Sequence, residues 1–179
     1  MNIAILFILL TLSLLFISID ASAHDKYIVG IDAGSTGSRC FVFKMTLDDE
    51  GKRHVNSFPC GKVQPGLSTF TSKASDAASY LTPLLLSASD IIPASYYPST
   101  SVFIKGTAGM RLLSEEEQSS LWEQLIVDLN NNKALPFKLS RNDIGTISGH
   151  QEAFYAVLAS NYIAGSIDGN LLLVNLFIF

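Results

Sequence analysis

The stretch YIVGIDAGSTGSRCFVFKM (residues 27–45) places a run of Gly, Ser and Thr between two segments of strand-forming residues. β-Branched and aromatic side chains dominate both segments, which predicts strands over residues 27–32 and 38–47. Asp32 ends the first strand, and Arg39 lies just inside the second. The stretch therefore predicts a strand–loop–strand hairpin with one acidic and one basic side chain beside its loop.

The loop of this hairpin has the composition of an anion-binding turn. Gly34 and Gly37 allow the backbone to direct N–H groups inward as a nest. Hydroxyl donors come from Ser35, Thr36 and Ser38. The spacing fits neither the P-loop nor the G-x-G-x-x-G pattern, and a strand follows instead of a helix, so a helix dipole is not the expected anion trap. An ordinary Gly/Ser/Thr turn is the alternative.

The remaining chain adds a third strand in succession and then strands separated by helices. Predicted strands cover residues 54–63, 101–106 and 144–148, and predicted helices cover 72–90, 114–129 and 150–165. Pro83 is expected to bend the first helix or to begin a new one. Three consecutive strands favour a meander, and the later units favour parallel β-α-β connections. The sequence therefore predicts an α/β protein with a mixed five-stranded sheet and flanking helices.

Length and composition are those of a folded domain. The chain has 179 residues, which is enough for one domain with its own core. Apolar residues make up 48% and charged residues only 16%, which excludes a disordered polypeptide. The formal net charge is -4 and no Lys/Arg-rich run occurs, so nucleic acid is not expected as a partner.

The first 23 residues have the pattern of a secretory signal. The apolar core over residues 3–17 is about 15 residues long, shorter than the ~20 of a membrane-spanning helix. A small-x-small site, Ala21-Ser22-Ala23, follows it and suits signal peptidase. An uncleaved signal anchor, which would attach the protein to a membrane, is the alternative. Either form predicts the secretory pathway, with a secreted, cell-surface or Golgi/endomembrane lumenal protein.

Two cysteines fall on strands that should pair with each other. The predicted turn at residues 48–51 joins these strands, and residues equidistant from it face each other. Position 40 then lies opposite position 60 or 61, so Cys40 and Cys60 are expected as cross-strand neighbours with Cα atoms about 4.5–6 Å apart. An oxidising compartment permits a disulfide between them. Two unrelated thiols are the alternative.

Two later stretches also place polar residues directly after strands. IKGTAGMRLL (residues 104–113) ends a buried strand in a Gly/Thr loop, and ISGHQEAFYAVLASNYIAG (residues 147–165) places Glu152 in the first turn of a helix. Ligands of α/β sheets collect at the carboxyl ends of strands, so Asp32, Thr107 and Glu152 are expected at one edge of the sheet. A carboxylate in a first turn can also serve only the helix dipole.

The motifs DAGSTGSR (residues 32–39), GTAGMRLL (106–113) and SGHQEAFYAVLASNYIAG (148–165) closely resemble the first three conserved regions of the apyrase family. This is the nucleoside triphosphate diphosphohydrolase family of ecto-ATPases and GDPases. VQPGLSTF (63–70) is similar to its PG(L/I)S segment. The resemblance implies the actin/Hsp70/hexokinase-like ATPase fold (ribonuclease H-like), of which residues 24–165 would form the first lobe.

The resemblance also implies a reaction and a set of site residues. The reaction would be hydrolysis of nucleoside tri- or diphosphates to lower phosphates and inorganic phosphate, with Ca²⁺ or Mg²⁺ as cofactor. Glu152 matches the general base, and Asp32 and Glu152 would hold the metal through water. The positions that match the phosphate site are Ser35, Thr36, Gly37, Ser38, Arg39, Thr107 and Ala108. Arg39 and Arg111 are further candidates for anion clamps, and a pair between Arg111 and Glu115 is the alternative for the second.

The sequence departs from the family pattern at two places. Ala153 stands where the family has Gly after the catalytic Glu, and residues 166–179 form an apolar tail where the family continues with a second phosphate loop and a second lobe. We therefore expect an incomplete chain, and a catalytically silent lobe from a truncated transcript is the alternative function. A sugar kinase or exopolyphosphatase of the same fold would not explain Glu152 within GHQEAFYA. The sequence predicts neither the preferred nucleotide nor an oligomeric state.

Overall fold

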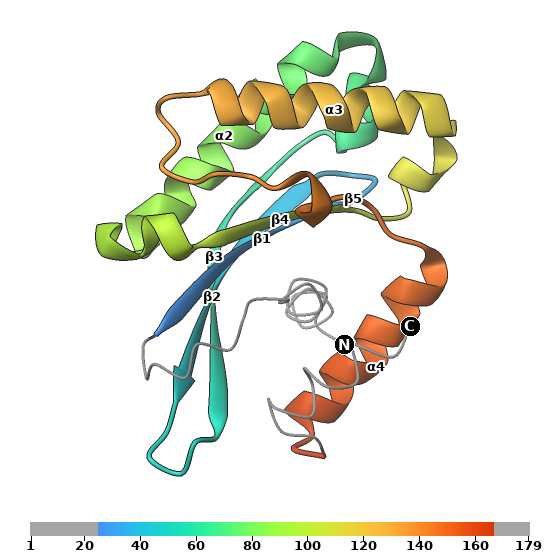
Figure 1. The fold of residues 1–179 in the computed structure, drawn as a ribbon. Coiled ribbons are helices and arrows are strands. Elements are labelled where there is room, and N and C mark those ends of the chain that lie inside the picture. The colour runs from blue at the N-terminus through green and yellow to red at the C-terminus, as the bar shows by residue number, and fades with distance from the viewer. Residues whose placement is uncertain (1–24, 167–179) are drawn as a thin grey trace.

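The structure, a computed structural model, describes residues 25–166, which form one mixed sheet with helices on both faces (Figure 1). The strands follow each other in space in the order β3-β2-β1-β4-β5. Their bounds are β1 Lys26–Ala33, β2 Ser38–Leu47, β3 Arg53–Val63, β4 Ser101–Gly106 and β5 Ile144–Thr146. β2 pairs antiparallel with both β1 and β3, whereas β1 pairs parallel with β4 and β4 with β5. The predicted meander followed by parallel units is confirmed.

Within the described part of the chain, three α-helices flank the sheet: α2 Ala74–Ile91, α3 Glu115–Asn131 and α4 Gly149–Ile163. Short 3-10 helices cover Leu67–Lys73, Ala94–Ser99, Met110–Leu112 and Arg141–Asp143. A capping box begins α3, because the Ser114 side chain accepts from the N–H of Glu117 and the Glu117 carboxylate accepts from the N–H of Ser114. Pro83 lies inside α2, so the expectation that it begins a new helix is wrong.

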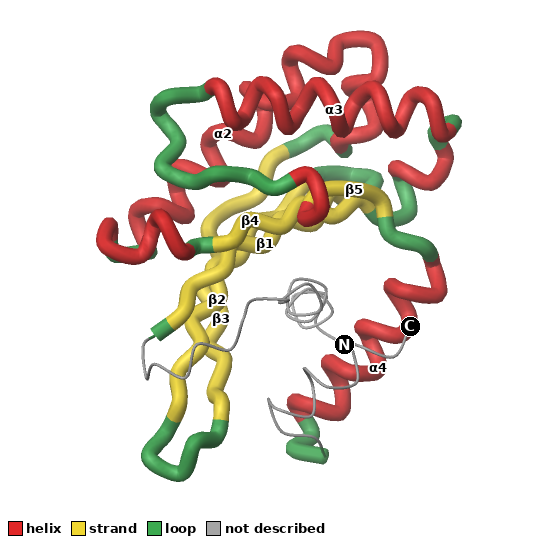
Figure 2. Tube along the Cα trace, viewed as in Figure 1, coloured by secondary structure: helices red, strands yellow, loops and turns green. Residues whose placement is uncertain are grey.

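The two faces of the sheet carry different layers. Helices α2 and α3 cover one face, and α4 lies on the other side of the sheet (Figures 1 and 2). Side chains of β1 alternate between the faces, as the period of a strand requires. Val29 and Ile31 belong to the large core under α2 and α3, whereas Ile28 packs with Phe43 and Phe103 on the opposite face. Because β1 is covered on both sides, its carboxyl end is rigidly placed at the centre of the sheet edge.

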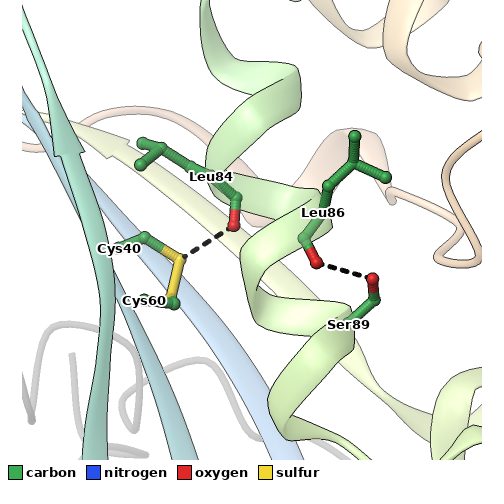
Figure 3. The surroundings of a disulfide bond; sticks show 5 residues. All are labelled: Cys40, Cys60, Leu84, Leu86 and Ser89. Carbon is green, nitrogen blue, oxygen red and sulfur yellow. Dashed lines mark hydrogen bonds between the residues drawn. A yellow bond between two sulfur atoms is a disulfide. The ribbon is translucent and has the colours of Figure 1, made fainter.

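Cys40 and Cys60 form a disulfide between β2 and β3 (Figure 3). Cys40 is the register partner of Gly61, and a bulge follows it, so Cys60 falls directly across the pair of strands. The Cα atoms are 5.0 Å apart, as the hairpin register predicts. The Cys40 Sγ lies 3.6 Å from the carbonyl oxygen of Leu84, a packing contact against α2, since a disulfide sulfur carries no hydrogen to donate. The register prediction and the bond it allowed are both confirmed.

The regions predicted to be a signal (residues 1–23) and most of the apolar tail (166–179) lie outside the described residues. Their assignments remain predictions, as do the limits of the lobe. Within residues 25–166, the helices lack the combination of length and apolar character that crossing a membrane requires.

Removing the disulfide should destabilise the chain. The two cysteines are 20 residues apart, and closing a loop of this size stabilises a protein by about 3 kcal/mol in the chain-entropy model. We expect the double substitution Cys40→Ala and Cys60→Ala to lower the free energy of unfolding by about 2–4 kcal/mol in denaturant titrations. The unsubstituted chain in excess reductant is the matched comparison and should lose a similar amount. An unchanged unfolding midpoint in both cases would contradict a stabilising disulfide.

Candidate active site

The loops that follow β1 and β4 touch each other at the carboxyl edge of the sheet. The N–H of Thr107 donates to the carbonyl oxygen of Ala33 at 3.2 Å, which extends the parallel pairing beyond the strand ends. The N–H of Gly34 donates to the carbonyl oxygen of Gly37 at 3.0 Å and closes the first loop. A Cβ placed on Gly109 would lie 2.7 Å from the Cα of Ser35, so the two loops approach at backbone distance.

The residues that connect β5 to α4 place the first turn of α4 at the same carboxyl edge of the sheet. The N–H of Ile147 donates to the carbonyl oxygen of Gly106 at 3.0 Å. Ser148 then caps α4, because its side chain accepts from the N–H of Gln151 at 3.1 Å and its own N–H donates to the Gln151 side chain at 2.9 Å. The cap fixes the first turn of α4, which contains Glu152.

Asp32 is a buried carboxylate with one partner from β2 and one from the loop after β4. Its side chain is only 8% exposed. Arg39 is its register partner on β2, and the Arg39 Nη1 lies 3.4 Å from the Asp32 Oδ2. The Thr107 hydroxyl lies 3.5 Å from the Oδ1 as donor. Burial raises the pKa of Asp32 to about 6, against the opposing charge of Arg39 and with a further upward contribution from the charge of Glu152.

Glu152 is held by an arginine from the loop after β4. The Arg111 Nη1 donates to the Glu152 Oε2 at 2.8 Å and to the carbonyl oxygen of Ile147 at 3.1 Å. The alternative pairing of Arg111 with Glu115 is therefore wrong. Since the charge of Glu152 raises the pKa of Asp32, the two carboxylates lie close enough to interact electrostatically. Each acid of the site thus has its own arginine.

The predicted phosphate-binding residues differ in their exposure to solvent. Ser35, Thr36 and Ala108 are exposed at the edge of the sheet, Arg39 is half-buried, and Gly37 and Thr107 are buried within the loops. Ser38 is the exception, because it has no exposed surface and its Oγ lies 3.4 Å from the hydroxyl of Tyr80 on α2. Its hydroxyl therefore points into the protein, away from the groups that Ser35 and Thr36 present.

The sequence did not predict that a second segment, residues 63–66, packs under the first loop. A Cβ on Gly37 would lie 2.5 Å from the carbonyl oxygen of Val63, and a Cβ on Gly66 would overlap the carbonyl oxygen of Ser35. Residues 63–66, which include a cis peptide bond between Gln64 and Pro65, thus pack directly against residues 34–37. The PG pair within VQPGLSTF was the only sequence signal for this layer.

The model of the GDA1/CD39 (nucleoside phosphatase) family matches residues 18–173. The chain belongs to this family. The resemblance to apyrases and GDPases inferred from the three motifs is confirmed.

Curated relatives support the same assignment. The chain is 37% identical to a Golgi apyrase of Saccharomyces cerevisiae, an alignment that covers 82% of this chain and 26% of the relative. It is 32% identical to a guanosine-diphosphatase of Schizosaccharomyces pombe, covering 80% and 25%, and 35% identical to a nucleoside-triphosphatase of Caenorhabditis elegans, covering 84% and 28%. The chain therefore spans about a quarter of the length of these relatives.

A solved structure gives the fold. The crystal structure of nucleoside triphosphate hydrolases from Neospora caninum superposes with a TM-score of 0.58 at 20% identity, covering 79% of this chain and 32% of that one. The GDA1/CD39 chain thus has the predicted actin/Hsp70/hexokinase-like fold, with a mixed five-stranded sheet and flanking helices.

Ionisation of Asp32 should lower the stability of the fold. The pKa is about 6 in the folded chain and about 3.9 when unfolded, so between pH 4 and 6 the folded state keeps a proton that the unfolded state has released. Stability contributed by the neutral carboxyl is therefore lost as pH rises through this window. In metal-free denaturant titrations, we expect Asp32→Asn to be more stable than the unsubstituted chain by roughly 1–3 kcal/mol at pH 7.5, with the difference shrinking towards pH 4.

Asp90→Asn is the control for this measurement, because Asp90 is exposed on α2. It makes the same chemical change at an exposed position, and Asp32→Asn should stabilise the chain more than this variant does at pH 7.5. A gap between the Asp32→Asn variant and the unsubstituted chain that widens as pH falls would contradict the assigned shift.

Proposed function

We propose that this chain carries the phosphate-binding and general-base half of a hydrolase that cleaves nucleoside tri- or diphosphates to lower phosphates and inorganic phosphate. The observation that carries the proposal is the convergence of three segments: Thr107 contacts Asp32, Arg111 binds Glu152, and the loop of residues 107–109 packs against Ser35. Family membership and relatives named apyrase, guanosine-diphosphatase and nucleoside-triphosphatase support it.

The loops would bind the terminal phosphate. Phosphoryl transfer spreads negative charge over the phosphate oxygens, and fixed N–H and hydroxyl donors stabilise that charge without reorganising. We assign this contact to side chains and backbone N–H groups of the two loops and to the guanidinium group of Arg39. The residues are Ser35, Thr36, Gly37, Arg39, Thr107 and Ala108. Ser38 would support the loop from behind through its contact with Tyr80.

Glu152 would act as the general base. Arg111 occupies the Oε2 of Glu152, and we assign the Oε1 to the attacking water. Because Arg111 is itself fixed by the carbonyl of Ile147, the carboxylate has a defined direction. A base held in this way can orient the water for in-line attack and take its proton.

A divalent cation, Ca²⁺ or Mg²⁺, fits the donor set only through water. Among residues 25–166, no group of three or more His, Cys, Asp or Glu side chains could enclose a metal ion. A hard cation that keeps most of its waters needs only one or two carboxylates and the substrate phosphates. Asp32 and Glu152 would hold such an ion through water. When bound, the cation would neutralise charge on the phosphate oxygens.

The compartment proposed for this activity is the secretory pathway, either the cell surface, the exterior or the Golgi lumen. The disulfide between Cys40 and Cys60 suits an oxidising compartment, and one relative is named a Golgi apyrase. Attachment to a membrane through the first 23 residues belongs to the same proposal.

Substitution of the base tests the mechanism. We expect Glu152→Gln to lower kcat for phosphate release at least ~10²-fold, the low end of what a positioned base contributes. Release is measured with ATP, GDP and UDP in the presence of Ca²⁺ or Mg²⁺, on this chain and on any longer form of the protein. Glu116→Gln is the matched control, because Glu116 also lies in the first turn of a helix but is exposed on α3.

Activity of Glu152→Gln within a few-fold of the unsubstituted protein would remove Glu152 from the mechanism. Phosphate binding by this chain without release from any nucleotide would favour the silent lobe over the hydrolase.

A further inference from the structure

The hydroxyl of Tyr80 lies among three oxygen atoms behind the first loop. It contacts the carbonyl oxygen of Val63 at 3.1 Å, the carbonyl oxygen of Pro65, and the Oγ of Ser38 at 3.4 Å. The ring of Phe70 packs against the Tyr80 ring with centroids 4.7 Å apart. Tyr80 thus reaches from α2 to two separate segments of the chain, and its ring is held in place.

These three oxygens belong to the segments that frame residues 34–37. Ser38 is the first residue of β2 after the loop, and Val63, its register partner, is the last residue of β3. Residues 63–66 then pack on the loop, since neither Gly37 nor Gly66 has room for a Cβ against the facing carbonyl groups. No side chain separates the two backbones at these points. A displacement of residues 63–66 is therefore transmitted directly to residues 34–37.

The proton count fixes the direction of the hydrogen bonds. A phenol has one hydrogen, and a carbonyl oxygen can only accept, so Tyr80 donates to Val63 or Pro65. The Ser38 hydroxyl then serves as donor to the Tyr80 oxygen. This arrangement satisfies Ser38, which is completely buried, and explains why its hydroxyl turns away from the exposed side of the loop.

We propose that Tyr80 is a positioning residue for the phosphate loop: its hydroxyl fixes residues 63–66 and Ser38, and these hold residues 34–37 in the geometry that binds phosphate. The inference rests on the proposed function of that loop. A purely structural role is the competing explanation, since a half-buried tyrosine also stabilises the fold.

Tyr80→Phe and Tyr97→Phe separate the two roles. Both substitutions keep the ring and remove one hydroxyl bonded to a carbonyl oxygen, but the Tyr97 hydroxyl donates to Ser89 at 2.8 Å near the far end of α2. A structural role predicts similar losses of stability from both variants and no selective effect on the loop. A positioning role predicts that only Tyr80→Phe alters the loop.

The first measurement needs no ligand. The N–H of Gly34, bonded to Gly37, and the N–H of Thr69, bonded to Gly66, report on the two packed segments. We expect Tyr80→Phe to accelerate amide hydrogen exchange at both positions about 10-fold or more, with no such change in Tyr97→Phe. Unchanged exchange in Tyr80→Phe would overturn the proposal, whether or not the chain binds phosphate.

The second measurement is calorimetric titration with inorganic phosphate in the presence of Mg²⁺. We expect Tyr80→Phe to weaken phosphate binding about 5- to 10-fold, and Tyr97→Phe to leave it unchanged. In any form of the protein that releases phosphate from nucleotides, kcat should fall more than KM rises. Equal weakening by both variants would overturn the proposal in favour of a structural role. Absence of phosphate binding by the unsubstituted chain would instead contradict the proposed function, while the exchange result still decides the role of Tyr80.

Ser38→Ala is the second variant, which keeps the bond that Tyr80 donates to Val63 or Pro65. It should accelerate exchange at Gly34 less than Tyr80→Phe does. A larger effect of Ser38→Ala would contradict the assigned order, in which Tyr80 is the common partner of both segments.

Discussion

The pairing of β1 with strands of opposite direction on its two sides is the constraint on which the site depends. The antiparallel neighbour β2 returns past the end of β1, so Arg39 lies opposite Asp32. The parallel neighbour β4 ends beside β1 and continues into the loop that contains Thr107. The buried carboxylate of Asp32 thus has a guanidinium group from β2 on one side and a hydroxyl group from the loop after β4 on the other.

Two glycine residues allow the surrounding loops to approach the backbone of the first loop closely. Gly109 lies against the Cα of Ser35, and Gly66 lies against its carbonyl oxygen. A methyl group at either position would meet backbone atoms, which cannot move aside as a flexible side chain does. The backbone at Ser35 is therefore enclosed by neighbouring backbone on two sides. Such rigidity is what electrostatic stabilisation of a phosphate requires, because the donors must not reorganise during reaction.

The charged side chains of the site form two carboxylate–arginine ion pairs instead of a cluster of carboxylates. Arg39 accompanies Asp32, and Arg111 accompanies Glu152. The burial of Asp32 still outweighs the attraction of Arg39, so the pKa of Asp32 is raised and not lowered. An ion of high charge density near this carboxylate would reverse that balance and favour its ionised form. The raised pKa of Asp32 is thus compatible with the proposal that a hydrated divalent cation binds beside this carboxylate.

The sequence by itself determined the local elements, the order of strands along the chain and the hairpin register that brings Cys40 and Cys60 together, because turns, capping boxes and strand periodicity act over short separations. Its motifs also identified the family and most of the candidate site. Tertiary structure alone decided that Arg111 binds Glu152, 41 residues away, and that Ser38 turns inward to Tyr80, 42 residues away. Hydroxyl and guanidinium groups have many potential partners in a sequence, and only the placement of helices on the two faces of the sheet selects among them.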